Sequence, residues 1–121
     1  MTNSIQFING AWEAGEGQKF DSVDPARNEV IWSGESASAN QVEKAVMAAR
    51  QAFPEWAEKS VDERLAICKK FSELLEENKE HLARTMAKET GKPVWETRTE
   101  VGAMMGKVAI SERAYNERTG T

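Results

Sequence analysis

The chain has 121 residues, of which 40% are apolar and 30% are charged, and its formal net charge is −4. This balance is typical of one globular domain or part of one, and it excludes a disordered chain. Nucleic-acid binding depends on clustered Lys and Arg, and no basic run is present. One cysteine and one histidine exclude a disulfide framework and a four-ligand zinc site.

The first seven residues lack a charged start followed by an apolar run, so no signal peptide is predicted. No apolar stretch is long enough to span a bilayer. We therefore expect a cytoplasmic protein with neither a membrane nor a nucleic acid as partner.

Residues 1–37 have the pattern of short strands separated by turns. Residues 5–8 and 11–14 are predicted to pair as a hairpin, because Asn9-Gly10 between them tolerates the positive φ angles of a tight turn. Gly15-Glu16-Gly17 is expected to end this hairpin.

A second pair of strands is predicted next. Residues 20–23 alternate between apolar and polar side chains, and residues 24–28 combine Asp-Pro with Asn, which favours a turn. The apolar segment 30–32 predicts a short buried strand.

From Ser38 onward the apolar period changes from two to about 3.6, which predicts four helices over residues 38–121. Asn78 is expected to separate the second helix from the third. Gly91 should end the third helix in the left-handed conformation, and Pro93 should occupy the first position of the fourth. The predicted capping boxes are Ser38 or Asn40 with Gln41 or Glu43, and Ser60 with Glu63.

Each predicted helix has an apolar stripe that we expect to face the core. In the long fourth helix, Gly102 and Gly106 lie one turn apart, which favours tight packing or the close approach of another element. The stripes are Val42, Ala45, Val46, Ala49 and Phe53; Leu65, Cys68, Phe71, Leu74 and Leu75 with Ile67 beside them; Leu82 and Met86; and Val94, Val101, Met104, Met105, Val108 and Tyr115.

Residues with catalytic potential have simpler interpretations here. The segment from Gly15 to Phe20 begins like a dinucleotide fingerprint, but it lacks the third glycine and opens no helix, so we interpret it as a turn. Cys68 is interpreted as a packing residue, because an apolar stripe disfavours the thiolate. His81 is expected to be solvated. We also expect an exposed acidic face, formed by Glu73, Glu76, Glu77 and Glu80. The tryptophans are expected to anchor small packing clusters; they are Trp12, Trp32, Trp56 and Trp95.

The order and spacing of several motifs resemble the aldehyde dehydrogenase family over nearly the whole chain. Two departures fall in the turn at residues 24–28, where the family often has asparagine before the proline and Thr-Gly in place of Arg27-Asn28. Asn28 can still adopt the left-handed conformation, so the same fold is expected. The motifs are Phe7 to Trp12, Asp24 to Ile31, Ala48-Ala49-Arg50 with Ala52-Phe53 and Trp56, Arg64 with Leu74-Leu75-Glu76, and Glu89-Thr90-Gly91-Lys92-Pro93.

Further residues of the fourth helix resemble the branch of this family that oxidises a succinylated glutamate semialdehyde during arginine breakdown. They are Pro93, Trp95-Glu96, Thr99-Glu100-Val101, Ala103-Met104, Lys107, Ala109-Ile110-Ser111, Ala114-Tyr115 and Arg118-Thr119-Gly120.

The resemblance implies an α/β parent enzyme that uses NAD, a cysteine nucleophile, an asparagine in the oxyanion hole and a glutamate that activates water. The family carries these residues beyond the matched region. We therefore assign no catalytic, cofactor-binding or metal-binding residue here. Residues 1–121 are expected to be the N-terminal part of the NAD-binding domain, truncated before the catalytic domain and inactive alone.

The resemblance also implies one substrate-facing position. The residue that matches Met104 lines the substrate entrance in this family, and Lys107 lies three residues later, where a cation could attract an anionic aldehyde. The alternative is that Met104 is core and Lys107 is solvated.

As an isolated fragment, the chain is expected to be α+β, with a hairpin region and about four helices. Its partners would be the remainder of the parent chain and further copies of itself, because exposed apolar surface favours association. The alternative function is a stand-alone helical module for protein interaction or oligomerisation, without catalysis.

Overall fold

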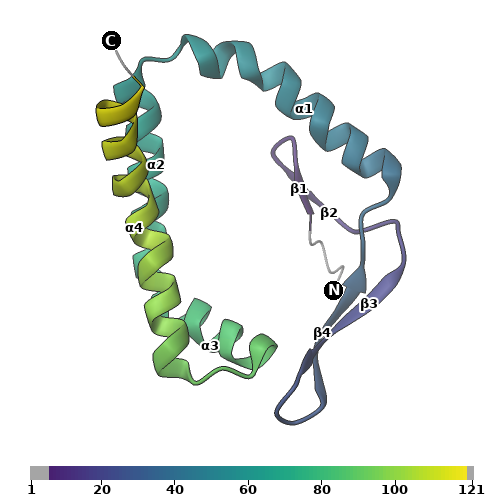
Figure 1. Cartoon of the computed structure of the whole chain (residues 1–121). Coiled ribbons are helices and arrows are strands. Elements are labelled where there is room, and N and C mark those ends of the chain that lie inside the picture. The colour runs from purple at the N-terminus through teal and green to yellow at the C-terminus, as the bar shows by residue number, and fades with distance from the viewer. Residues whose placement is uncertain (1–5, 120–121) are drawn as a thin grey trace. The chain divides into compact units, whose positions relative to one another are not determined.

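The computed structural model describes residues 6–119 and contains four strands and four helices (Figure 1). The fold divides between Lys59 and Ser60 into two units, which are described separately. The α+β prediction is confirmed, with two small antiparallel strand pairs and four helices.

The first unit begins with the hairpin of β1 (Gln6–Ile8) and β2 (Ala11–Glu13). Asn9 and Gly10 have φ angles of 52° and 80°, which confirms the predicted turn. The expected strand position at residue 5 lies outside the described residues. Across the hairpin, the rings of Phe7 and Trp12 lie 5.1 Å apart.

The second hairpin pairs β3 (Lys19–Asp24) with β4 (Glu29–Glu35). The Asp24 carboxylate accepts hydrogen bonds from the backbone N–H groups of Ala26 and Arg27, and Asn28 has a φ of 56°, so the predicted turn forms. The prediction of a buried strand at residues 30–32 is wrong. Val30 is exposed and Ile31 and Trp32 are half-buried, because the two-stranded sheet of β3 and β4 packs closely against no other described element of the first unit.

Helix α1 (Ala39–Glu58) completes the first unit and contains Pro54. Its cap is the predicted box of Ser38 and Gln41. The expected buried stripe is wrong for this helix. Val42, Val46 and Phe53 are all more than half exposed, because no described element of the first unit covers that face.

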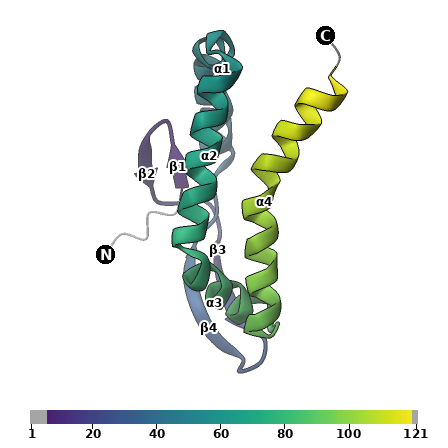
Figure 2. The same ribbon diagram turned by 90° about the vertical axis from the view of Figure 1, so that its left-hand side faces the viewer.

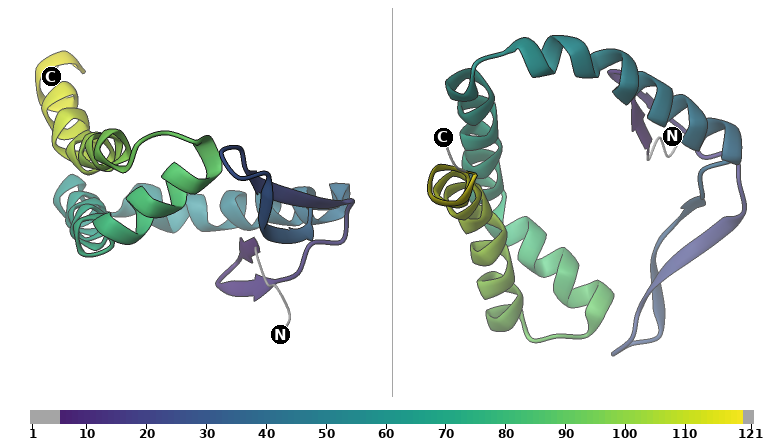
Figure 3. Two further views of the ribbon diagram at one scale, coloured as in Figure 1. Left: turned by 90° about the horizontal axis from the view of Figure 1, so that it is seen from below. Right: turned by 45° about the horizontal axis from the view of Figure 1, so that its top comes forward.

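The second unit consists of α2 (Val61–Glu77), α3 (Lys79–Thr90) and α4 (Val94–Arg118). Helix α4 packs against both α2 and α3. Figures 2 and 3 show α2 and α4 close together near α3 and diverging toward the start of α2 and the end of α4. The small core of this unit contains Leu75, Ala83 and Val101.

The boundaries of these helices follow the sequence closely. The capping box of Ser60 and Glu63 is confirmed, and Asn78 lies between α2 and α3. Gly91 has a φ of 72°, as predicted for the end of α3. Pro93 is the N-cap residue rather than the first helical residue, since its ψ of 141° is extended.

The apolar faces of these helices were predicted less well. Ala83 is fully buried, whereas Leu82 and Met86 on either side are half-buried, because the small alanine lies where α3 contacts α4. In α2 only Leu75 of the predicted stripe is buried, and Leu65 and Cys68 are half-buried. The stripe residues Ile67, Phe71 and Leu74 are exposed, as are Met104 and Tyr115 of α4.

Candidate functional site

The predicted substrate-facing residues lie on α4, which is held against α3 by a buried hydroxyl. Thr97 is fully buried, and its Oγ1 donates to the carbonyl oxygens of Ala83, at 2.8 Å, and Val94, at 3.1 Å. A buried hydroxyl needs such acceptors, because an unpaired one loses its hydration without compensation. This bond therefore fixes the first turn of α4 against the middle of α3.

Two ion pairs lie at the same junction. Arg98 on α4 forms a bidentate pair with Glu80 on α3, with Nε and Nη2 at 2.7 and 2.9 Å from the two carboxylate oxygens. The hydrogen bond from Arg98 lowers the pKa of Glu80, and the neighbouring cations act in the same direction. Lys92, in the loop before α4, pairs with Glu100.

The other contact of α4 is with α2. Ser72 Oγ donates to the carbonyl oxygen of Met105 at 2.9 Å, and Lys69 Nζ lies 3.0 Å from a Glu112 carboxylate oxygen. Where the two helices diverge, an open groove of about 330 Å³ is present. We term it the α2–α4 groove. It is lined by Val61, Arg64, Leu65, Cys68, Lys107, Val108, Ser111, Glu112 and Tyr115.

The groove has apolar walls and two cations without a counterion. Arg64 Nε is buried, and no described residue accepts a hydrogen bond from it. Lys107 forms no ion pair within residues 6–119. The one carboxylate in the lining, Glu112, is already paired with Lys69.

Met104 and Lys107 are both exposed positions of α4, and Met104 retains 39% of its accessible surface. A separation of three residues places them about 60° apart around the helix axis. Lys107 lines the α2–α4 groove, whereas Met104 is not among its lining residues. The structure therefore places the two candidates on neighbouring faces of one helix and in different surroundings.

Gly102 and Gly106 were expected to allow close packing. Among the described residues, nothing lies within 4 Å of a Cβ built at either position. Within this chain, tight packing at these two glycines is therefore not observed.

The glycine-rich segment after β2 opens no helix, as predicted, and forms an irregular connection with a bend at Gly17. Gly17 N donates to the Ser36 carbonyl oxygen at 2.8 Å, and a Cβ placed at Gly15 would overlap the carbonyl group of Glu35. These glycines therefore allow two backbones to approach each other, and the segment leads into β3 rather than into a helix.

Among the other candidates, His81 is exposed, and Cys68 is half-buried in the wall of the α2–α4 groove. The acidic residues 73, 76, 77 and 80 are all exposed, as predicted. Trp12 and Trp32 each contact a phenylalanine ring, whereas Trp95 is 67% exposed, so the expected packing role of that residue is wrong. No group of three or more possible metal ligands occurs within residues 6–119.

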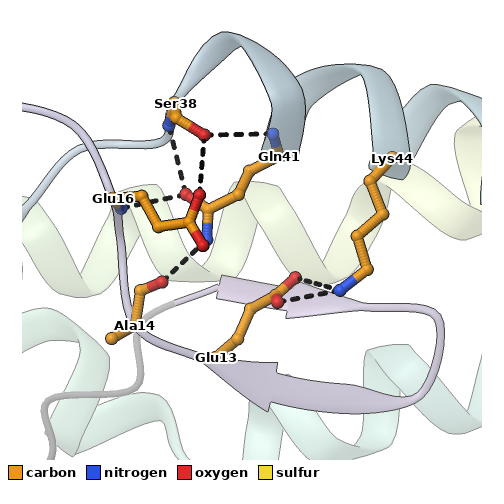
Figure 4. A network of polar contacts seen from close by, with 6 residues as sticks. All are labelled: Glu13, Ala14, Glu16, Ser38, Gln41 and Lys44. Atoms are coloured by element: carbon orange, nitrogen blue, oxygen red, sulfur yellow. Dashed lines mark hydrogen bonds and ion pairs between the residues drawn. The ribbon is translucent and has the colours of Figure 1, made fainter.

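The most connected polar side chain of the first unit, Gln41, was predicted only as a capping residue. Its Nε2 donates to the Ala14 carbonyl oxygen at 2.8 Å, and its Oε1 accepts from the N–H groups of Glu16 and Ser38 (Figure 4). Lys44 pairs with Glu13 one helical turn further along. The capping motif identified Gln41, but its contacts to residues 14 and 16 carry no local sequence signal.

The comparisons with known proteins agree on one family. A model of the aldehyde dehydrogenase family matches residues 12–121. The chain is 58% identical over 113 residues to the N-succinylglutamate 5-semialdehyde dehydrogenase of Chromohalobacter salexigens, and 50% identical over 120 residues to that of Acinetobacter baylyi. These alignments cover 93% and 99% of this chain but 23% and 24% of the relatives, so the chain spans about a quarter of their length.

Solved structures show the same fold. An NAD-dependent benzaldehyde dehydrogenase from Corynebacterium glutamicum superposes with a TM-score of 0.85 at 28% identity, covering 98% of this chain and 27% of that one. A betaine aldehyde dehydrogenase from Staphylococcus aureus, solved with NAD+, gives a TM-score of 0.86 at 23% identity, covering 99% and 25%. Within the described residues, none of the helices is long and apolar enough to cross a membrane.

Proposed function

Because this chain belongs to the aldehyde dehydrogenase family, we propose that residues 1–121 are the N-terminal part of the NAD-binding domain of a longer dehydrogenase. Within that part, residues 1–37 form the hairpin region and residues 38–121 the helical region. The longer enzyme would oxidise N-succinylglutamate 5-semialdehyde to N-succinylglutamate with NAD, in arginine catabolism.

One observation supports the proposed substrate. Identity to the N-succinylglutamate 5-semialdehyde dehydrogenase of Chromohalobacter salexigens is 58%, about twice the 28% shared with the benzaldehyde dehydrogenase of the same fold. The fold alone hosts several aldehyde specificities, so this higher identity is what supports the succinylated substrate.

We propose that the described residues supply no step of the chemistry. The one cysteine is half-buried in the α2–α4 groove, and the glycine-rich turn is filled by the backbone of residues 35 and 36. NAD would accept a hydride in the whole enzyme, and we propose that no residue in 6–119 binds it. We propose that this chain supplies structure and part of the substrate entrance, and that it is inactive alone.

The complete reading frame that encodes this chain provides the test. The purified full-length protein should reduce NAD in the presence of N-succinylglutamate 5-semialdehyde, with a higher kcat/KM than with benzaldehyde or betaine aldehyde. Parallel assays with NADP would establish the cofactor. A natural gene product with the intact mass of the 121-residue chain alone, or equal rates with all three aldehydes, would contradict the proposal.

We propose Met104 and Lys107 as the residues of this chain that face the substrate entrance. Both are exposed on α4, where apolar contact and positive charge could serve an aldehyde whose other end carries carboxylates. Lys107 has no carboxylate partner within the described residues, so its charge is not already neutralised.

The Lys107→Met variant of the full-length enzyme tests this assignment. Removing one cation near the substrate should raise KM for the succinylated aldehyde roughly threefold to tenfold, with little change for a neutral aldehyde. Lys88→Met, an exposed lysine on α3, is the matched control and should leave both constants unchanged. An unchanged KM for the anionic substrate would reject the role of Lys107 without affecting the family assignment.

The cytoplasmic location and a homo-oligomeric state of the full enzyme remain predictions. Sedimentation of the full-length protein would give its oligomeric state directly.

A further inference from the structure

The α2–α4 groove contains a charge that the described residues do not satisfy. Arg64 lies in the first turn of α2, and its Nε is buried without an acceptor. Arg64 as a whole is half-buried, but its Nε–H is shielded from solvent, and a buried donor without an acceptor is costly. An acceptor from outside residues 6–119 would satisfy this N–H.

The other lining residues indicate which side chains a partner bound in the groove must carry. Leu65, Val108 and Tyr115 provide apolar walls, and Tyr115 is 49% exposed. The only lining carboxylate, Glu112, is already paired with Lys69 and cannot serve Arg64. A partner that fits must bring apolar side chains together with a carboxylate.

We propose that the α2–α4 groove is the docking site for an acidic, apolar segment from the remainder of the full-length enzyme, which places an Asp or Glu carboxylate on Arg64. This inference rests on the proposed place of the chain in a longer enzyme. The relatives are about four times as long as the matched segment, so they contain ample chain to supply this segment. A second copy of this chain and a free carboxylate ligand are the competing occupants.

Photo-crosslinking identifies the occupant directly. The photoreactive residue p-benzoylphenylalanine is placed at Ser111, an exposed position in the groove lining, within the full-length enzyme. Irradiation should give a product of monomer mass, and its crosslinked peptide should lie beyond residue 121 and contain Asp or Glu. The readout needs neither substrate nor cofactor, so its result is independent of which aldehyde is oxidised.

Two results of this experiment would overturn the proposal. A crosslinked product of twice the monomer mass would identify a second copy as the occupant. Crosslinks confined to residues 1–121, or none above the un-irradiated sample, would show that no distant segment lies in the groove.

Arg64→Met gives an independent test, because the expected effect differs between two forms of the protein. In the 121-residue chain, Met keeps the apolar stem and removes an unpaired buried N–H, so the Tm should stay unchanged or rise. In the full-length enzyme, the same change leaves a buried carboxylate without its partner, so the Tm should fall. Arg113→Met, at an exposed arginine of α4, is the matched control and should alter neither Tm.

The two tests keep the inference falsifiable in every case. An equal fall of Tm in both forms, or no fall in the full-length enzyme, would overturn the role of Arg64. If the 121-residue chain does not fold, the crosslinked peptide and the Tm of the full-length variant still decide the question.

Discussion

At the residue scale, a few buried polar side chains connect elements that have little apolar core between them. Thr97 connects α4 to α3, and Gln41 connects α1 to the segment after β2. Both are almost completely buried, at 0% and 4% exposure. A satisfied hydrogen bond contributes modestly to stability, whereas an unsatisfied buried group is costly, so such residues determine geometry more than total stability.

Thr97→Val tests this role with nearly the same side-chain shape. Losing the bond to the Ala83 carbonyl oxygen should lower the free energy of unfolding by about 1 kcal/mol, measured by urea denaturation. Thr99→Val is the control, because the Thr99 hydroxyl also bonds within α4 but is exposed. Equal effects of the two substitutions would contradict a special role for the buried hydroxyl.

Two glycines should respond in opposite directions to the same substitution. Gly91 has a φ of 72°, so Gly91→Ala should destabilise the chain by about 1 kcal/mol. Gly102 lies inside α4 with open space around its Cβ position, so Gly102→Ala should stabilise the isolated chain by roughly 0.5–1 kcal/mol. Thermal unfolding of both variants provides the measurement, and destabilisation by Gly102→Ala would show a close contact that the described residues do not make.

At the scale of elements, α3 and α4 are connected by charge as well as by the buried hydroxyl. The pair of Glu80 and Arg98 joins residues 18 positions apart, and Arg98 lowers the pKa of Glu80 below its ordinary value of 4.5. A carboxylate whose pKa is lower in the folded state stabilises the fold above its unfolded pKa. This contribution is lost as the pH falls through the folded pKa.

Arg98→Met should therefore lower the Tm at about pH 7, and the difference from the unsubstituted chain should shrink steadily below about pH 4.5. The control is Lys70→Met, because Lys70 pairs with Glu73 inside α2 and connects no two helices. Thermal scans across this pH range are the measurement. A Tm difference that does not depend on pH would show that Arg98 acts through packing rather than through its charge.

The helices also differ in how well they are covered. Helix α4 buries Val101 completely against its neighbours, whereas α1 exposes Val42, Val46, Met47 and Phe53. Amphipathic helices are stabilised mainly by burial of their apolar face, so α1 gains less from burial than α4 does.

At the scale of the whole molecule, the chain corresponds to about a quarter of its relatives. Their fold is reproduced with a TM-score of 0.85 against the benzaldehyde dehydrogenase, so this part of the family's architecture is encoded within these residues. Helices α1 and α2 both expose large apolar side chains, and Arg64 Nε has no acceptor among the described residues.

Cofactor binding should separate this chain from the full-length enzyme. The isolated chain should show no thermal shift with NAD, because none of its described residues forms a pyrophosphate-binding loop. The full-length protein should be stabilised by about 2.7 kcal/mol at a NAD concentration 100 times its Kd. A saturable shift with the 121-residue chain would contradict its proposed lack of a cofactor site.

Much of the local structure was predictable because its causes lie within a few residues. Asn9-Gly10 specified the first turn, Ser60 with Glu63 the start of α2, and Gly91 the end of α3. The faces of the helices were harder to predict. The apolar period in α1 indicated a buried stripe, but burial also needs a second surface, and the first unit does not provide one.

In the candidate site, too, the sequence predicted single residues but not the contacts between distant residues. Motif order led to Met104 and Lys107 on α4, but no periodicity could show that Lys107 lines a groove with Arg64, because those residues are 43 positions apart. The unpaired state of Arg64 is likewise a property of its surroundings, not of its local sequence.

The order of strands and helices, the positions of their caps and turns, and the family could all be predicted from the sequence, since each depends on local backbone preference or on motif spacing. The folded chain alone shows which apolar faces stay uncovered, where α2 and α4 diverge into a groove, and which cations lack a partner among the described residues. Those properties depend on contacts between residues distant in the chain, and local preferences do not fix such contacts.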